Sequence, residues 1–319
     1  MRYRGALLAD VFKAWHVPRM AWRPVRKPLP TGRQATTLPY TNLKNEKSRM
    51  RHYRRVLAIA GSDSGGGAGI QADIKTISAC GCYAMTAITA VTVQNTVGVR
   101  AVHDVPADIV AGQIEAVMED IGADAVKIGM LKSTETVGCV CRALGTFGVG
   151  NIVVDPVMVS TSGHRLIDED AIEAVMTVLV PMSRIITPNI PEAEMIMNGG
   201  TIDSPEDMDD AARDMAGRTG VSVLLKGGHL DDTTLVDVFY DNERKEIRHL
   251  SAPRIPTRNT HGTGCTLSSA LASMLAKGMP LGDAVEAAKR YINGAITAGA
   301  DYETGHGHGP VKHFYELWR

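Results

Sequence analysis

The residues best suited to chemistry form one glycine-rich run, Thr260-His261-Gly262-Thr263-Gly264-Cys265-Thr266. Successive backbone N–H groups in such a turn, opening into the N-terminus of a helix, make a nest that binds an anion. Gly262 and Gly264 lack the Cβ atoms that would block close approach, and Cys265 falls in the first helical turn, where the helix dipole favours a thiolate. The run is suited to holding a phosphoryl group in transfer beside a polarisable side chain, although a turn that only starts a helix would look similar.

Four polar residues at the ends of predicted strands add groups that suit phosphate or metal. Asn189 and Glu192, an amide and a carboxylate three residues apart, can hold water on Mg²⁺ beside nucleotide phosphates. Alternatively, Asn189 only caps a helix that has Glu192 in its favourable first turn. Lys226 can neutralise phosphate charge or be an ordinary surface lysine, and Asp155 can orient a substrate hydroxyl or contact a metal.

A second glycine-rich loop, residues 61–69, follows the first predicted strand. Its spacing does not give the dinucleotide fingerprint, and it lacks the Lys-Ser/Thr end of a P-loop. We therefore expect a flexible turn that lets the backbone approach a small ligand. Asp73 lies one helical turn further, where a solvated carboxylate is the simpler interpretation. His306 and His308 have H-x-H spacing, but without a third ligand they indicate an ordinary loop rather than a metal site.

Charge is distributed unevenly along the 319 residues. Residues 1–55 hold 14 Lys and Arg against Asp10 and Glu46, a net charge of +12, so the remainder carries −13. Because this remainder is acidic, we do not expect its overall charge to attract nucleic acid. The five cysteines are an odd count with C-x-C spacing, which favours buried thiols in a reducing cytoplasm, and no apolar run is long enough to cross a bilayer.

The first 53 residues are basic, rich in proline and without hydrophobic periodicity, which predicts a disordered extension. Three interpretations of this extension remain open: a targeting segment, an arm that binds nucleic acid, or a start codon assigned too far upstream. The third is suggested by Met50, which lies just before the first predicted strand. The remainder, residues 54–319, is expected to be one domain.

The body alternates predicted strands and helices, and this pattern indicates an α/β fold with a mostly parallel sheet flanked by helices on both faces. Strands are predicted at 56–61, 84–94, 125–130, 151–157, 183–189 and 221–228, an antiparallel pair at 234–241 and 246–255 across Asn242-Glu243, and helices at 67–80, 106–121, 263–277 and 281–299. In such sheets ligands bind beyond the carboxyl ends of the strands, where the polar and glycine clusters fall.

Seven motifs occur together in one order, and jointly they resemble the hydroxymethylpyrimidine/phosphomethylpyrimidine kinases of the ribokinase-like superfamily. They are AGSDSGGGAGIQAD (60–73), TAVTVQNT (89–96), VKIGML (126–131), VVDPVM (153–158), ITPNIPEA (186–193), LLKGGH (224–229) and NTHGTGCTLSSA (259–270). The resemblance covers about residues 55–319.

The resemblance implies an enzyme of thiamine biosynthesis that uses Mg²⁺ and ATP. Such kinases phosphorylate 4-amino-5-hydroxymethyl-2-methylpyrimidine to the monophosphate and then to the diphosphate. Carried over by motif, the pyrimidine pocket comprises Gly61, Asp73, Gln94, Met130 and Val157. Around ATP, Lys226, Asn189 and Asp155 contact phosphate, Glu192 and Asn189 hold the metal through water, Gly262, Thr263 and Gly264 stabilise the transferred charge, and Cys265 is the base.

Two rival functions remain open. A pyridoxal/pyridoxine (vitamin B6) kinase acts on a similar methylated heterocycle, and Gln94 favours the aminopyrimidine because its amide can pair with both an exocyclic amine and a ring nitrogen. A non-catalytic pyrimidine-binding protein would instead use the basic extension on nucleic acid. We expect a cytoplasmic homodimer whose partners are the pyrimidine and ATP, without nucleic acid or membrane.

Overall fold

The computed structural model describes residues 52–159, 166–197, 199–228 and 233–318. The chain divides into two units, Met1–Met50 and Arg51–Arg319, and all described residues belong to the second. The predicted disordered extension, residues 1–53, therefore lies outside the described residues except for His52 and Tyr53. Among the described helices, none is long and apolar enough to cross a membrane.

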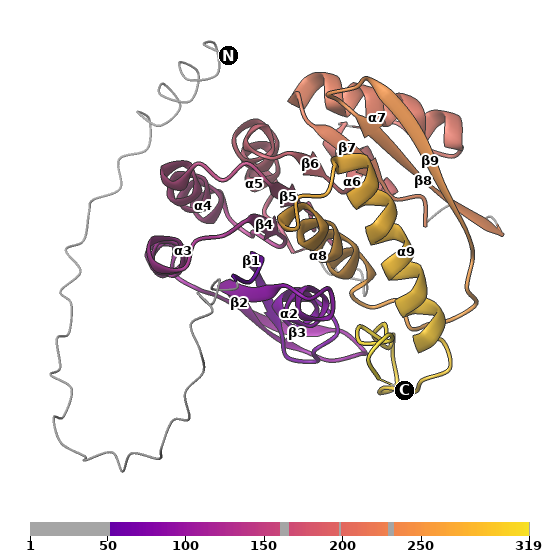
Figure 1. Ribbon diagram of the computed structural model, residues 1–319, viewed down its shortest axis with the longest axis horizontal. Coiled ribbons are helices and arrows are strands. Elements are labelled where there is room, and N and C mark those ends of the chain that lie inside the picture. The colour runs from indigo at the N-terminus through magenta and orange to yellow at the C-terminus, as the bar shows by residue number, and fades with distance from the viewer. Residues whose placement is uncertain (1–51, 160–165, 198, 229–232, 319) are drawn as a thin grey trace, which may run out of the picture. The chain divides into compact units, whose positions relative to one another are not determined.

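Nine strands within the described residues form one sheet in the order β3-β2-β1-β4-β5-β6-β7-β8-β9 (Figure 1). The strands are β1 (Arg55–Asp63), β2 (Tyr83–Gln94), β3 (Val99–Asp104), β4 (Ala125–Ile128), β5 (Ile152–Val154), β6 (Ile185–Ile186), β7 (Ser222–Leu225), β8 (Thr234–Asp241) and β9 (Glu246–Pro253). The six adjacent strands β2, β1, β4, β5, β6 and β7 are parallel, whereas the pairs β3–β2, β7–β8 and β8–β9 at the two edges are antiparallel. The predicted mostly parallel sheet is confirmed.

Helices cover both faces of the sheet, as predicted. They are α2 (Gly69–Ala79), α3 (Ala107–Asp120), α4 (Thr134–Phe147), α5 (Glu169–Ala174), α6 (Ile190–Ile196), α7 (Pro205–Thr219), α8 (Thr263–Ala276) and α9 (Leu281–Gly299). One hydrophobic core lies between the sheet and the group α3 to α7, and a second lies between the sheet and α2, α8 and α9. Neighbouring strand residues point to opposite faces, so Leu57 and Ile59 enter the first core while Val56 and Ala58 enter the second.

The strand β3 was not predicted. It pairs with β2, Val91 opposite His103, and its sequence VRAVHD lacks the alternation of apolar and polar residues that marks a half-buried strand. The antiparallel pair β8 and β9 is confirmed: Asp241 pairs with Glu246, so residues 242–245, which include the predicted turn Asn242-Glu243, connect the two strands. Lys245 takes a positive φ of 59° in this turn.

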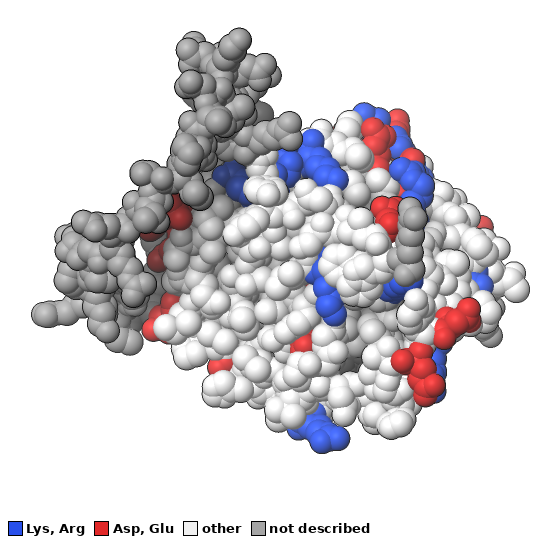
Figure 2. All heavy atoms as spheres, turned by 60° about the horizontal axis from the view of Figure 1, so that its bottom comes forward, with Lys and Arg blue, Asp and Glu red and all other residues white. Residues whose placement is uncertain are grey.

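Charged side chains on the face drawn in Figure 2 are of both signs and lie mainly toward its margins. On the described part of that face, Lys and Arg do not gather into one continuous basic surface.

Candidate active site

A cavity of about 170 Å³ opens at the carboxyl ends of the parallel strands, where ligands bind in open α/β sheets. A cavity of roughly 150 Å³ accommodates one benzene ring, so this one suits a single six-membered heterocycle. Of the predicted site residues, those that line it are Gly61, Gln94, Met130, Asp155, Val157, Asn189, Glu192, Lys226, Gly262, Thr263, Gly264 and Cys265. The structure thus brings together every predicted site residue except Asp73.

The anion loop, residues 262–265, begins helix α8. Gly262 is the N-cap, with a left-handed φ of 79°, and a Cβ there would collide with the carbonyl oxygen of Gly67. A Cβ on Gly264 would lie 3.3 Å from Lys226 Nζ and 3.4 Å from Asp155 Oδ2. Gly262 is therefore required by its backbone angle and by this collision, whereas a side chain at position 264 would crowd the charged pair that the loop faces.

Lys226 lies beside Gly264 of the anion loop and is paired with carboxylates. Its Nζ donates to Asp155 Oδ1 at 2.9 Å and lies 4.0 Å from Glu192 Oε2. Burial opposes the charge on Lys226, but the two carboxylates outweigh burial and raise its pKa. Lys226 is thus a fixed cation and not the ordinary surface lysine that the sequence left open.

Asn189 and Glu192 form a capping box at the start of α6. Glu192 N–H donates to Asn189 Oδ1 at 2.9 Å, and Asn189 N–H donates to Glu192 Oε2 at 2.8 Å. The predicted cap is confirmed, and both side chains still line the cavity. Burial raises the pKa of Glu192 to about 7, and Asp155 adds to the rise while Lys226 opposes it.

Carboxylate and amide oxygens suit Mg²⁺, which keeps several waters and binds through one or two carboxylates together with substrate phosphates. Glu192, Asp155 and Asn189 provide this donor set at the edge of the cavity that Lys226 occupies. Within the described residues, no three His, Cys, Asp or Glu side chains cluster closely enough to hold a metal by themselves. The donors present fit a magnesium ion that is held largely through water and phosphate.

Gly61, Met130, Val157 and Gln94 also line the cavity. A Cβ on Gly61 would touch Met130 Sδ at 3.4 Å, so the glycine leaves room for the thioether. Thioether and branched aliphatic groups suit the faces of a ring, and the Gln94 amide supplies both a donor and an acceptor. These four residues together suit one flat ring with a polar edge.

Asp73 does not line the cavity, and its predicted place in the substrate pocket is wrong. Its side chain is completely buried beneath the site. Lys127 Nζ donates to Asp73 Oδ1 at 2.8 Å and to Oδ2 at 3.0 Å, and Ser269 Oγ donates to Oδ1 at 2.7 Å. The alternative of a solvated carboxylate is equally wrong, because α2 turns this residue into the core.

Cys265 lines the cavity and is partly exposed, whereas Cys80, Cys82, Cys139 and Cys141 are buried. Burial raises the pKa of Cys265 to about 11, with Asp73 and Asp155 adding to the rise and Lys127 opposing it. The expectation that the helix N-terminus yields a thiolate is therefore wrong for the free site. The helix dipole and Lys127, which lower the pKa of Cys265, do not offset burial, Asp73 and Asp155, which raise it.

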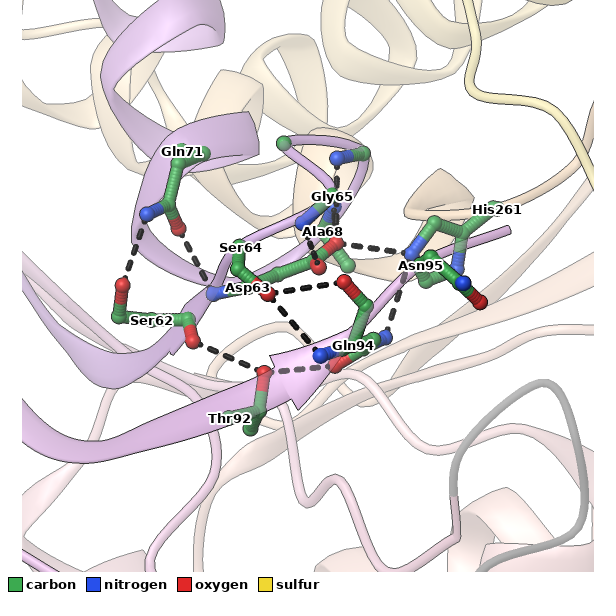
Figure 3. Close-up of polar contacts among 12 residues, drawn as sticks. Ser62, Asp63, Ser64, Gly65, Ala68, Gln71, Thr92, Gln94, Asn95 and His261 are labelled. Atoms are coloured by element: carbon green, nitrogen blue, oxygen red, sulfur yellow. Dashed lines mark hydrogen bonds and ion pairs between the residues drawn. The ribbon is translucent and has the colours of Figure 1, made fainter. Parts of the chain in front are cut away.

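The loop at residues 61–69 is organised by Asp63, which the sequence analysis did not single out (Figure 3). Asp63 Oδ1 accepts from Gly65 N–H at 2.8 Å, and Oδ2 accepts from the N–H groups of Gly67 at 3.1 Å and Ala68 at 2.8 Å. These amides therefore point at Asp63, and the expected flexible turn is instead tightly hydrogen-bonded. An aspartate followed by glycines is a recognised turn signal that could have revealed this.

His261 was quoted within the glycine-rich run but given no role. Its Nε2 lies 2.9 Å from Asp63 Oδ2, which makes an ion pair or a neutral hydrogen bond between two loops (Figure 3). Its backbone N–H donates to Gly309 O at 3.0 Å, and a Cβ on Gly67 would collide with its ring. Three loops thus meet at His261, directly before the anion loop.

Comparisons with known proteins agree with this geometry. The family model for phosphomethylpyrimidine kinase matches residues 63–312. The hydroxymethylpyrimidine/phosphomethylpyrimidine kinase of Rhizobium meliloti is 50% identical over 264 residues, 82% of this chain and 98% of that protein. The crystal structure of phosphomethylpyrimidine kinase from Clostridium difficile is 45% identical, with a TM-score of 0.67 over 76% of this chain and 99% of that one. The ADP complex of Bacillus subtilis pyridoxal kinase is 33% identical, with a TM-score of 0.77 over 84% of this chain and 100% of that one.

Proposed function

Since this chain belongs to the phosphomethylpyrimidine kinase family, we propose that it transfers the γ-phosphoryl group of ATP to 4-amino-5-hydroxymethyl-2-methylpyrimidine and then to the resulting monophosphate. One observation carries the proposal. The anion loop, Lys226 and the ring-contacting residues Met130, Val157 and Gln94 line the same cavity. An acceptor and a phosphoryl donor that share this cavity would meet beside Cys265.

We place the pyrimidine ring between Met130 and Val157, with its polar edge against Gln94, because all three residues line the cavity. The Gln94 carbonyl accepts from the exocyclic amine, and its NH₂ group donates to the neighbouring ring nitrogen. With the edge held there, the hydroxymethyl group is directed toward the anion loop. Holding the acceptor in this way removes much of the entropic cost of bringing the two reactants together.

The transferring phosphoryl group lies between Lys226 and the amides of residues 262–264. Phosphoryl transfer passes through a loose transition state, so most catalysis comes from positioning and from stabilising charge. Lys226, whose Nζ is held 2.9 Å from Asp155 Oδ1, supplies a positive charge at a fixed position. Glu192, Asp155 and Asn189 would hold Mg²⁺, which neutralises phosphate charge when it is bound.

Cys265 takes the hydroxymethyl proton in the first transfer. Because its pKa is about 11 in the free site, only about one site in 10⁴ carries the thiolate at pH 7. A loose transition state tolerates this, since the attacking oxygen needs to lose its proton only late. In the second transfer the acceptor is a phosphate, which is already ionised and needs little help from a base.

Product mass analysis tests the proposal. The protein is incubated with Mg-ATP and, separately, with the hydroxymethylpyrimidine, its monophosphate and pyridoxal. Formation of the pyrimidine monophosphate and diphosphate supports the two-step kinase. Efficient pyridoxal phosphorylation without a pyrimidine diphosphate would contradict it and support the rival B6 kinase, an activity that the structural relative from Bacillus subtilis has. The homodimer and the cytoplasmic location stay predictions.

A further inference from the structure

The side chain of His261 faces two groups, the carboxylate of Asp63, which accepts a hydrogen bond, and the amide nitrogen of Gln94, which donates one (Figure 3). Its Nε2 lies 2.9 Å from Asp63 Oδ2 and 3.4 Å from Gln94 Nε2. Asp63 is almost fully buried, and the hydrogen bonds from His261, Ala68 and Gly65 outweigh burial and lower its pKa. An ionised carboxylate only accepts hydrogen bonds. His261 Nε2 therefore carries a hydrogen, and the amide nitrogen of Gln94 faces another donor.

The other end of the Gln94 amide has the matching conflict. Thr92 Oγ1 lies 3.0 Å from Gln94 Oε1 and also 3.0 Å from the carbonyl oxygen of Ser62. A threonine hydroxyl has one hydrogen, so it can donate to only one of these two acceptors. In the amide orientation of Figure 3, the N–H groups of Gln94 and His261 face each other at one end. At the other end, Gln94 Oε1 and Ser62 O compete for the one hydrogen of Thr92.

Turning the amide by 180° removes the facing donors and the competition for the Thr92 hydrogen, since the oxygen and nitrogen of a side-chain amide are exchanged by such a turn. Gln94 Oε1 then faces the N–H of His261, and Gln94 Nε2 donates to Thr92 Oγ1. Thr92 donates in turn to Ser62 O, which already lies at 3.0 Å. The single N–H of His261 is then shared between Asp63 Oδ2 and Gln94 Oε1, as in a three-centre hydrogen bond, and no two donors face each other between Asp63 and Ser62.

We propose that the Asp63–His261 pair and Thr92 are specificity-determining residues that lock the Gln94 amide in this one orientation and thereby select an aminopyrimidine. The inference rests on the proposed function, in which Gln94 contacts the ring edge. His261 and Thr92 act through Gln94 and are positioning residues, since they fix the order in which the amide presents its acceptor and its donor.

The orientation matters because two related ring edges carry opposite patterns. An aminopyrimidine presents a donor, the amine, beside an acceptor, the ring nitrogen. Its 4-oxo analogue presents an acceptor, the carbonyl, beside a donor, the ring N–H. The hydroxymethyl group must face the anion loop, so the ring can enter in only one direction. A locked amide then pairs with one pattern alone, whereas an amide that turns freely pairs with both.

The test is the ratio of kcat/KM for the 4-amino substrate to that for its 4-oxo analogue. His261→Phe keeps a ring against Gly67 but removes the N–H, and Thr92→Val keeps the shape of the side chain but removes the hydroxyl. We expect each to lower the ratio on the order of tenfold, the effect of one unpaired buried polar group. The 4-oxo analogue should gain turnover as the 4-amino substrate loses it.

Conservative variants separate locking from general damage. His261→Gln can still donate to Asp63 and to Gln94, and Thr92→Ser keeps the hydroxyl, so both should restore the ratio toward that of the unchanged protein. Ser64→Ala is the matched control, because Ser64 bonds only the backbone of Gln94, with Oγ 2.8 Å from its O and 2.9 Å from its N. Its ratio should not change.

The outcomes distinguish the inference from the function. If the unchanged protein fails to phosphorylate the aminopyrimidine, the proposed function is wrong and the inference falls with it. If it phosphorylates the aminopyrimidine and discriminates, but His261→Phe and Thr92→Val keep the full ratio, the function stands and the lock is overturned. Equal losses for both compounds would likewise indicate a merely structural role.

Discussion

Lys127 and Asp73 form a completely buried ion pair, with Lys127 Nζ 2.8 Å from Asp73 Oδ1 and 3.0 Å from Oδ2. Lys127 belongs to the central strand β4 and Asp73 to helix α2. Ser269, one turn beyond Cys265 in α8, donates to the same carboxylate. The pair therefore joins the sheet to both helices that carry the cavity's glycine-rich loops.

Removing one partner of this pair should destabilise the protein strongly. Burial opposes the charge on Lys127, but Asp73, Cys265 and Asp155 outweigh it and raise its pKa. Lys127→Met leaves a buried carboxylate without its cation, which costs about 3–5 kcal/mol, whereas replacing both partners by apolar residues of similar volume costs much less. Urea unfolding of Lys127→Met and of Lys127→Met with Asp73→Leu measures the difference.

The control for that prediction is an exposed pair. Arg213 and Asp210 lie 3.1 Å apart on the surface of α7, and such pairs contribute about 0–1 kcal/mol. Arg213→Met should therefore leave the urea midpoint nearly unchanged. A double variant as unstable as Lys127→Met alone would contradict the assignment of the cost to an unpaired charge.

Cys265→Ser should impair the first phosphoryl transfer more than the second. The first acceptor is a hydroxyl that must lose its proton, and a positioned base contributes about 10²–10⁴-fold, while the second acceptor is an ionised phosphate. We expect a loss of at least about tenfold in the first step, given the small thiolate fraction, and less than about threefold in the second. Separate steady-state assays with the hydroxymethylpyrimidine and with its monophosphate measure the two. Equal losses would remove Cys265 from the role of base.

Alkylation of Cys265 should be slow at neutral pH and should accelerate as the pH rises. Only the thiolate reacts, and burial raises the pKa of this thiol to about 11. Below that value the thiolate fraction increases tenfold for each pH unit, so the rate with iodoacetamide should rise about a hundredfold from pH 7 to pH 9. Peptide mass spectrometry follows the residue by itself. A rate that levels off below pH 8 would mean that the helix N-terminus lowers the pKa after all.

Glu192→Gln should weaken the activation of the enzyme by Mg²⁺ about tenfold at pH 8, an effect on the order of one lost carboxylate ligand. Glutamine at this position keeps the capping box, so the stability of α6 should change little. The pKa of Glu192 is about 7, and the protonated carboxyl binds a cation poorly. In the unchanged protein the Mg²⁺ requirement should therefore rise as the pH falls from 8 to 6, and the variant should lose this dependence.

Glu194→Gln is the matched control for the magnesium titration. Glu194 lies on the same helix but accepts from Ile202 N–H at 3.0 Å, and it does not line the cavity. Its Mg²⁺ requirement should follow that of the unchanged protein at every pH. A Glu192→Gln enzyme that follows the same curve would show that this carboxylate does not hold the metal.

The fold follows from local pattern to a large extent. The central strands β4, β5, β6 and β7 are short, mostly apolar and buried throughout, and helical segments separate them along the chain, so a mostly parallel sheet can be derived from the sequence. The edge strand β3 was not predicted, because an exposed edge strand packs against no core and its sequence need not alternate apolar and polar residues. Most residues that line the cavity could also be predicted from the sequence, because they follow parallel strands whose carboxyl ends meet at one edge of the sheet.

The polar partners of the site were harder to find. A lysine inside the otherwise apolar strand β4, AVKI, has to be paired, because lysine is almost never fully buried alone. That signal predicts a buried carboxylate but does not say which one. Asp63 and His261 are 198 positions apart, and no local pattern relates them. Cys265 shows the opposite failure, in which a correct local rule was outweighed by the burial and the carboxylates around it.

The position of the anion loop late in the chain has a consequence for synthesis on the ribosome. All nine described strands precede residue 254, whereas α8 and α9, which cover one face with α2, follow it. At about 5–20 residues per second, a nascent chain carries a nearly complete sheet with one apolar face uncovered for several seconds. That face is then open to chaperones and to other nascent chains, and the cavity closes only after the C-terminal loops that contact His261 have emerged.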